Sequence, residues 1–259
     1  MKHLLICIIS LLFIAPAASS QARHIINVDA FDELYAKGSC AIELRYNPDS
    51  VGMVLINTTP EIYNGLEKAL VQRSLYISMP QGVQSGATRI TLYCNTNLQT
   101  ISVSERCKLS IPKAINFSYD LSLLSTSFAT ITAADIRSSA LRVSATGGAH
   151  VTVNNATVSS TLSISAVGSS RVSFAKVSAN DLNATLRGSG SVDVVGSVAN
   201  RPSLVVKGTG TIDVAGVRAP RIQAAVYGEG SIMVPKSVTV EAQGKSDHIF
   251  VPSSKTPTK

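Results

Sequence analysis

The 259-residue sequence contains no tryptophan, and aromatic residues make up only 5% of it. Enzymes that bind polysaccharides use aromatic side chains as platforms for sugar rings, so this scarcity argues against them. Charged residues are also few, at 15%, and they form no run of five like charges. Nucleic-acid binding needs a clustered basic stripe. We therefore attribute the net charge of +7 to charged side chains scattered over a solvated surface, and we expect no nucleic-acid partner.

Long apolar runs are missing beyond the start of the chain. The segment from Leu4 to Ala15 follows a short basic start and precedes small residues, an order typical of a secretory signal peptide. We assign residues 1–22 to that peptide. No later stretch reaches the roughly 18 to 20 apolar residues that a membrane-spanning helix needs. The sequence thus predicts an exported chain without a transmembrane segment.

Cysteines are scarce as well. Cys7 lies in the signal peptide, which leaves Cys40, Cys94 and Cys107. An exported protein can form disulfides, and Cys94 and Cys107 are the closest pair in sequence. A bridge between these two is compatible with the sequence, and so are three buried free thiols.

Signatures of catalysis and of metal binding are absent. His24, His150 and His248 do not stand near cysteines or carboxylates at metal-ligand spacing. No Gly-x-Ser-x-Gly nucleophile elbow occurs. We therefore predict no catalytic residue, no metal and no cofactor.

What the sequence does contain is a repeat marked by glycine. The segments GSGSVDV, GTGTIDV and GEGSIMV begin at Gly188, Gly208 and Gly228, and steps of 20 or 21 residues lead back to Gly168 and Gly147. Apolar residues stand at fixed even offsets before and after each glycine, and mostly polar residues stand between them. This alternation predicts two strands per repeat, one on each side of a tight turn.

A 20-residue unit with two strands and no helix cannot bury its apolar side alone. Stacked in register, such units form a parallel β-helix, which we predict over residues 91–251. We expect a disordered polar tail at 252–259. Sharp turns need a positive φ, which residues with a Cβ avoid, so Gly-x-Gly supplies the turn conformation. The predicted turn glycines are Gly147, Gly168, Gly188, Gly190, Gly208, Gly210, Gly228 and Gly230.

Residues 23–90 lack the glycine spacing. Apolar and polar residues alternate in segments 41–47 and 52–57, which predicts two strands that pair with each other. Thr59 before a proline predicts the start of a short helix, with an apolar face that reaches Leu70. We assign the whole region to a β-rich cap that is continuous with the repeats and covers their open edge.

The signal peptide, the opening FDELYAKGSCAIELRYN and the repeated glycine segments resemble one family, the autotransporter-adhesin head domain, also termed the head GIN domain, of exported bacterial proteins. The resemblance spans nearly the whole mature chain. It implies a right-handed β-helix related in shape to pectin lyases, without their catalytic residues, and a role in adhesion. It also implies the periplasm or the outer surface of a Gram-negative-type bacterium.

Two outward ladders supply candidate contact residues. Asp193 and Asp213 occupy equivalent positions in adjacent repeats, where stacked carboxylates could form an acid/base pair or hold a hard cation. Six residues earlier in each repeat, Arg187 and Lys207 form a basic column that Tyr227 continues. We interpret the two ladders as compensating charges on a solvated face, and the basic column as the candidate binding surface.

Three functions remain compatible with the sequence. One is a non-catalytic adhesion or interaction module that binds a glycan or a protein, and we predict this one. Another is a polysaccharide-degrading enzyme of pectin-lyase shape, which would need several ionisable groups converging in one groove. The third is a structural envelope protein that self-associates.

Overall fold

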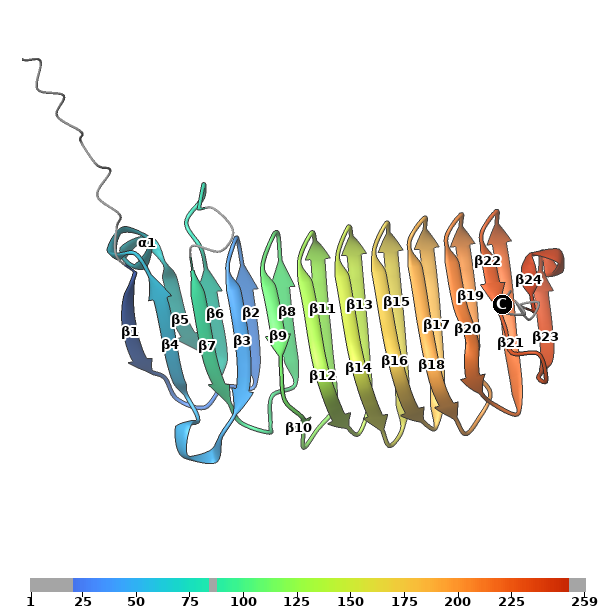
Figure 1. The fold of residues 1–259 in the computed structure, drawn as a ribbon, viewed down its shortest axis with the longest axis horizontal. Helices are drawn as coiled ribbons and strands as arrows, with labels where there is room; N and C mark the ends of the chain where they lie inside the picture. Colours follow the sequence, from blue (N-terminus) through green and yellow to red (C-terminus); the bar gives the residue numbers. More distant parts are fainter. Residues whose placement is uncertain (1–20, 84–87, 252–259) are drawn as a thin grey trace, which may run out of the picture.

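The computed structural model describes residues 21–83 and 88–251. Two β-sheets face each other along a rod, with β1 (Ala22–Asn27) at one end and β23 (Thr239–Gly244) and β24 (Ile249–Phe250) at the other (Figure 1). The 13-stranded sheet is termed sheet A and the 11-stranded sheet is termed sheet B. The predicted signal peptide, up to its last two residues, and the predicted tail lie outside the described residues.

Each sheet has its own order of strands along the rod. Sheet A runs β1, β4 (Met53–Thr58), β7 (Arg89–Cys94), β3 (Ala41–Tyr46), β9 (Lys108–Ile111), β12 (Thr130–Ser138), β14 (His150–Val158), β16 (Arg171–Ala179), β18 (Ser191–Val198), β20 (Thr211–Arg218), β22 (Ser231–Met233) and β24, with β10 (Ile115–Asn116) beside β12. Sheet B runs β5 (Glu67–Val71), β6 (Ser74–Ser78), β2 (Glu33–Lys37), β8 (Thr100–Ser104), β11 (Leu121–Ser127), β13 (Leu141–Gly147), β15 (Thr161–Gly168), β17 (Asp181–Gly188), β19 (Ser203–Gly208), β21 (Arg221–Gly228) and β23.

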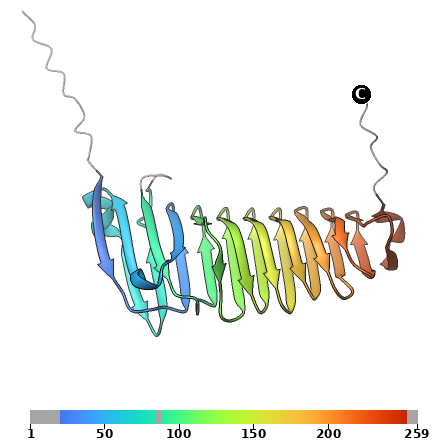
Figure 2. The same ribbon diagram turned by 60° about the horizontal axis from the view of Figure 1, so that its bottom comes forward.

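From β11 onward, each coil gives one strand to each sheet and pairs in parallel with the next coil. The pairing is in register, so that Val151 of β14 lies beside Val172 of β16, which lies beside Val192 of β18. Figure 2 shows the same coils from a second angle as an unbroken stack. The predicted parallel β-helix is confirmed.

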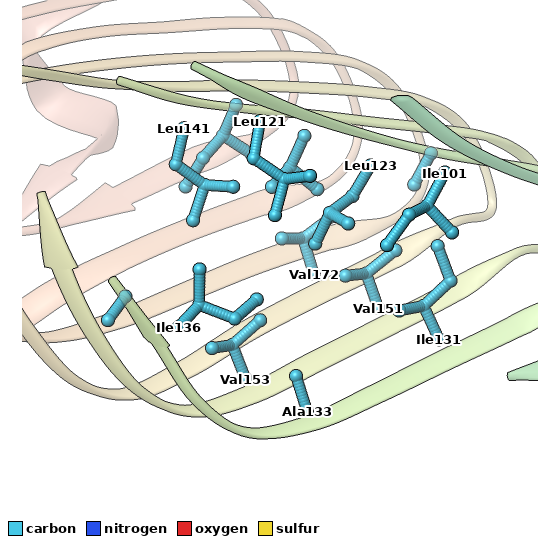
Figure 3. Packing of buried hydrophobic residues seen from close by; sticks show 14 of the residues in the cluster. Ile101, Leu121, Leu123, Ile131, Ala133, Ile136, Leu141, Val151, Val153 and Val172 are labelled. Carbon is cyan, nitrogen blue, oxygen red and sulfur yellow. The ribbon is translucent and has the colours of Figure 1, made fainter. Parts of the chain in front are cut away.

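The core lies between the sheets and consists mainly of aliphatic side chains. Figure 3 shows side chains of β11 and β13 directed toward those of β12, β14 and β16, among them Leu121, Leu123, Leu141, Ile131, Val151 and Val172. Each of these side chains is at most 1% exposed, and burial of one such side chain stabilises the fold by roughly 1.5 to 3 kcal/mol. The alternation of apolar and polar residues therefore produces one continuous core with two polar outer faces.

The first glycine of each turn has the backbone conformation that the turn requires. Gly147, Gly168, Gly188, Gly208 and Gly228 have φ values of 76°, 81°, 115°, 129° and 133°. The turn also forms hydrogen bonds from coil to coil, since the Gly188 carbonyl oxygen accepts from the Gly210 amide at 2.9 Å. Side chains with a Cβ avoid this left-handed region, which explains the glycine column.

The second glycine is needed for a different reason. Gly190, Gly210 and Gly230 are not among the residues with positive φ. A Cβ on Gly210 would lie 2.4 Å from the Gly190 carbonyl oxygen and 2.7 Å from Leu186 Cδ2. The second glycine therefore permits a close approach between neighbouring coils, whereas the prediction assigned it to the turn conformation.

The coil nearest the start of the chain is inserted out of order. Strand β2 lies between β6 and β8, and β3 lies between β7 and β9, and all these neighbours are parallel. Residues 33–46 thus form a complete coil between two coils that come later in the sequence. Strands β2, β3 and β6, which lie in the region assigned to the cap, are therefore part of the stack, and β3 and β4 do not pair with each other because β7 lies between them.

The actual cap is an antiparallel layer. Strand β4 pairs antiparallel with β1 and β7, and β5 pairs antiparallel with β6. The helix α1 (Pro60–Gly65) joins β4 to β5, and Thr59 Oγ1 caps it by accepting from the Ile62 amide. The helix is shorter than predicted: Leu70 lies in β5 beside Leu75, so sheet pairing replaces the later helical turns.

Candidate interaction surfaces

The predicted basic column forms one ladder on the outer face of sheet B. Arg187 of β17 lies beside Lys207 of β19, which lies beside Tyr227 of β21. Lys207 Nζ is 5.7 Å from the centroid of the Tyr227 ring, a cation–π distance. Tyr227 is 49% exposed, so the ladder presents two cations and one aromatic ring to solvent.

A shallow trough of about 580 Å³ adjoins this ladder. Its lining includes the central ladder of the same face, where Ser144, Ser165 and Thr185 lie side by side on consecutive coils. Arg142 and Arg187 are among its lining residues, and the lining includes no carboxylate. Short hydroxyl side chains with two arginines around them make a positively charged depression that crosses several coils.

The central ladder ends at the inserted coil in an aromatic pair. Tyr35 and Tyr76 stack with their ring centroids 5.0 Å apart and an interplanar angle of 9°. Tyr35 lies beside Ser102, which lies beside Leu124 at the edge of the trough. The two tyrosines are 41 positions apart in sequence, so reading the repeat alone does not bring them together.

Asp193 and Asp213 lie on the other outer face. They are neighbours on β18 and β20 of sheet A, whereas Arg187 and Lys207 belong to sheet B. The structure therefore does not support the expected compensation between the two ladders. The carboxylate pair and the basic column instead lie on opposite outer faces, and the cation that acts on Asp193 is Arg171 of sheet A.

The two carboxylates have different surroundings. Asp213 Oδ1 accepts from the Ala215 amide at 2.9 Å, where the pairing of β18 and β20 shifts register. Asp193 Oδ2 accepts from Ser191 Oγ at 3.3 Å. Partial burial raises the pKa of Asp193, and the negative charge of Asp213 adds to that increase, while Ser191 and Arg171 oppose it. The geometry gives Asp213 a structural role, since it binds backbone.

Cys40, Cys94 and Cys107 are buried free thiols in the structure, which is one of the two arrangements that the sequence left open. Cys107 lies beside Cys40, with their Sγ atoms 3.5 Å apart. Cys94 Sγ donates instead to the Arg45 carbonyl oxygen at 3.4 Å, and burial raises the pKa of the Cys94 thiol to about 12. Cys94 is the nearer partner of Cys107 in sequence. The insertion of the first coil brings Cys40 beside Cys107, and this insertion is not visible in a sequence repeat.

Within residues 21–83 and 88–251, no three or more His, Cys, Asp and Glu side chains gather as metal ligands would. In the same residues no helix is both long and apolar enough to cross a membrane. The candidate surfaces lie on the two outer sheet faces, with the trough and the aromatic pair on sheet B.

Comparison with known families agrees with this architecture. The family model described as putative auto-transporter adhesin, head GIN domain, matches residues 30–195 and again residues 141–250. The chain belongs to this family. Both matches include residues 141–195, as expected for a head GIN domain built from repeated coils. No curated protein matches the sequence.

Solved structures share the fold of this head GIN domain. A putative adhesin from Bacteroides fragilis NCTC 9343 is 16% identical, with a TM-score of 0.69 over 88% of this chain and 98% of that one. A putative adhesin from Parabacteroides distasonis ATCC 8503 is 15% identical, with a TM-score of 0.68 over 88% of this chain and 95% of that one. A putative adhesin from Parabacteroides merdae ATCC 43184 is 13% identical, with a TM-score of 0.57 over 88% and 98%.

Proposed function

We propose that this head GIN domain is an exported, non-catalytic adhesion module that binds a linear acidic glycan across the outer face of sheet B. The trough carries the proposal, because it combines hydroxyl side chains with Arg142 and Arg187 and includes no carboxylate in its lining. Guanidinium groups pair well with carboxylate and sulfate oxygens. Family membership and the adhesin-named structural relatives support an adhesive role.

The stacking geometry suits a polymer. Adjacent coils are about 4.8 Å apart, so a ligand lying along the rod meets the equivalent hydroxyls of Ser144, Ser165 and Thr185 on three consecutive coils. Tyr35 and Tyr76 continue the same ladder beyond Leu124 and supply aromatic surface for a sugar ring. Each contact is weak, and display of many copies on a surface increases the overall avidity.

The enzyme alternative has less support. Asp193 and Asp213 are the adjacent carboxylates that a lyase or hydrolase would use, and Asp213 is already bound to the Ala215 amide. We therefore expect no cleavage of acidic or neutral polysaccharides, and Asp193→Asn to have no effect on any such assay.

A glycan array probed with the multimerised mature chain tests the proposal. We expect binding to carboxylated or sulfated polymers but not to neutral ones, with weakening as salt screens the arginines. The double substitution Arg142→Gln and Arg187→Gln should reduce binding by about tenfold or more. Arg218→Gln is the matched control, since Arg218 is an exposed arginine on sheet A.

Equal loss in both variants, or equal binding to neutral polymers, would contradict the assignment to sheet B. Retained binding to acidic proteins with none to acidic glycans would replace the glycan with a protein ligand on the same surface. Polysaccharide cleavage that Asp193→Asn abolishes would favour the enzyme.

A further inference from the structure

Two buried thiols meet where the inserted coil contacts its neighbour. Cys40 directly precedes β3 and Cys107 directly precedes β9, and these strands are adjacent in sheet A. Their side chains are 3% and 0% exposed. The Lys108 amide donates to the Cys40 carbonyl oxygen at 2.9 Å, so the backbones are fixed in register at this point.

The contact joins parts of the chain that are far apart in sequence. Cys40 and Cys107 are 67 positions apart. The chain leaves β3 toward β4 and reaches β8 only after β7, so no short connection links the inserted coil to the coil of β8 and β9. Hydrogen bonds and packing alone hold that junction in the reduced protein.

We propose that Cys40 and Cys107 form a disulfide that fixes the inserted coil in the stack, and that Cys94 remains a thiol. The proposal rests on the proposed export, because thiols become bridged in oxidising compartments. Neighbouring strands place paired Cα atoms about 4.8 Å apart, within the roughly 4.4 to 6.8 Å range of disulfides. The Sγ atoms need to approach only from 3.5 Å to about 2.05 Å.

The oxidant is a second disulfide, either of a dithiol oxidase or of a small molecule such as oxidised glutathione. The thiolate of one cysteine attacks this disulfide, forms a mixed disulfide and releases one thiol of the oxidant. The thiolate of the other cysteine then attacks the protein sulfur and releases the second thiol. Two protein thiols lose two electrons and two protons, and the oxidant is reduced to two thiols.

The reaction belongs to an early stage of folding. In the folded chain, the contact with Cys40 and burial both raise the pKa of Cys107, so its reactive thiolate is suppressed. An oxidant also cannot reach side chains that are 3% and 0% exposed. The bond therefore forms while the inserted coil is still open to solvent, and it is then enclosed.

Refolding of the reduced protein in a glutathione redox buffer tests the pairing. Free thiols are alkylated after denaturation in acid, and peptides are mapped by mass spectrometry before and after reduction. We expect a linked pair of peptides containing Cys40 and Cys107, and alkylated Cys94. Three alkylated cysteines, or a linked peptide containing Cys94, would overturn the proposal.

Variants and the source of the protein complete the test. A reductant that reaches the bond should lower the Tm of the wild type and of Cys94→Ser by about 5 to 15 °C, and should leave Cys40→Ser unchanged. Equal shifts in Cys40→Ser would overturn the cross-link. Protein isolated from the producing cells should carry the same bridge. A bridge after refolding but three thiols in the cell-derived protein would overturn the export and leave the pairing chemistry intact.

Discussion

Residues 33–111, apart from the antiparallel strands β4 and β5, and residues 121–234 both build parallel coils, but the chain passes through them in different orders. After Leu121 each coil lies beside the one that precedes it in sequence. Before that point, the coil of β2 and β3 is placed between β6–β7 and β8–β9. The contacts are equivalent in both regions, because neighbours are set by matching ladders of side chains and not by distance along the chain.

The inserted coil carries the same repeat as the later ones. Gly38 has φ of 95°, and Ile42 and Leu44 follow it at the offsets where Val192 and Val194 follow Gly188. Sequence spacing hides this copy, since the equivalent position in the next coil of the stack is far downstream. Alignment of GSCAIEL with GSGSVDV would have revealed it.

The turn is filled differently along the rod. At the position of the second turn glycine, five successive coils of the stack carry the buried residues Cys40, Cys107, Ala129, Ala149 and Ser170. The coils that follow carry Gly190, Gly210 and Gly230 there, and Leu186 and Val206 occupy the space beside Gly210 and Gly230 from the other side of the turn. A larger residue on one side of the turn thus accompanies a smaller one on the other, which keeps the packing dense.

The largest effect should come from truncating the core of the inserted coil. Ile42 and Ile131 are 2% and 0% exposed, on β3 and β12. Because β3 has neighbours on both sides, we expect Ile42→Ala and Ile131→Ala each to lower the free energy of unfolding by about 3 kcal/mol. Urea denaturation measures both. A cost for Ile42→Ala below about 1 kcal/mol would indicate a peripheral cap in place of an inner coil.

The glycine column should give the next largest effect. A Cβ at Gly208 would lie 2.6 Å from the Gly188 carbonyl oxygen, in a residue whose φ is 129°. We expect Gly208→Val to destabilise the fold by about 2 to 3 kcal/mol. The control is Thr209→Val in the same turn, where the exposed side chain should tolerate the change within about 0.5 kcal/mol. If Gly208→Val kept the wild-type midpoint in urea, the turn would not need a glycine.

Introducing a glycine tests the same column in the first coil that follows the order of the sequence, the coil of β11 and β12. Ser127 occupies the glycine column with φ of 62° and is exposed. Glycine accepts this conformation without strain, so Ser127→Gly should stabilise the protein by about 0.5 to 1 kcal/mol. A lower Tm for this variant would contradict the account of the column.

The smallest effect concerns the carboxylate ladder on sheet A. A raised pKa means that folded Asp193 holds its proton more tightly than the unfolded chain does. The contribution of protonated Asp193 to the free energy of unfolding is therefore present at low pH, and it is lost as pH rises from about 4 through the raised pKa. Asp193→Asn should remove this dependence and stabilise the protein at pH 7 by a few tenths of a kcal/mol, because solvent screens the charge.

Asp213→Ala is the contrast to that variant. It removes the acceptor of the Ala215 amide and should cost about 1 kcal/mol at the same pH. Destabilisation of similar size in both variants would show that Asp193 also has a structural role.

The sequence was sufficient for the β-helix, the first glycine of each turn and the ladder of Arg187, Lys207 and Tyr227, because each depends on a spacing of 20 or 21 residues. It was not sufficient for the stacked pair of Tyr35 and Tyr76 or the contact between Cys40 and Cys107. These depend on an insertion that joins strands distant in sequence. Alternation also cannot tell which of the two sheets a strand joins, so Asp193 was placed on the wrong face relative to Arg187.

The order of the coils has a consequence for a chain that crosses a membrane with its N-terminus first. The coil of β2 and β3 cannot acquire its neighbours until β7 and then β9, which ends at Ile111, have emerged. Contacts between distant segments form slowly, so the leading part of the chain stays unfolded during that interval. Each later coil can dock as soon as it arrives. Insertion of the first coil thus delays folding at the N-terminal end, which is the leading end in the proposed export.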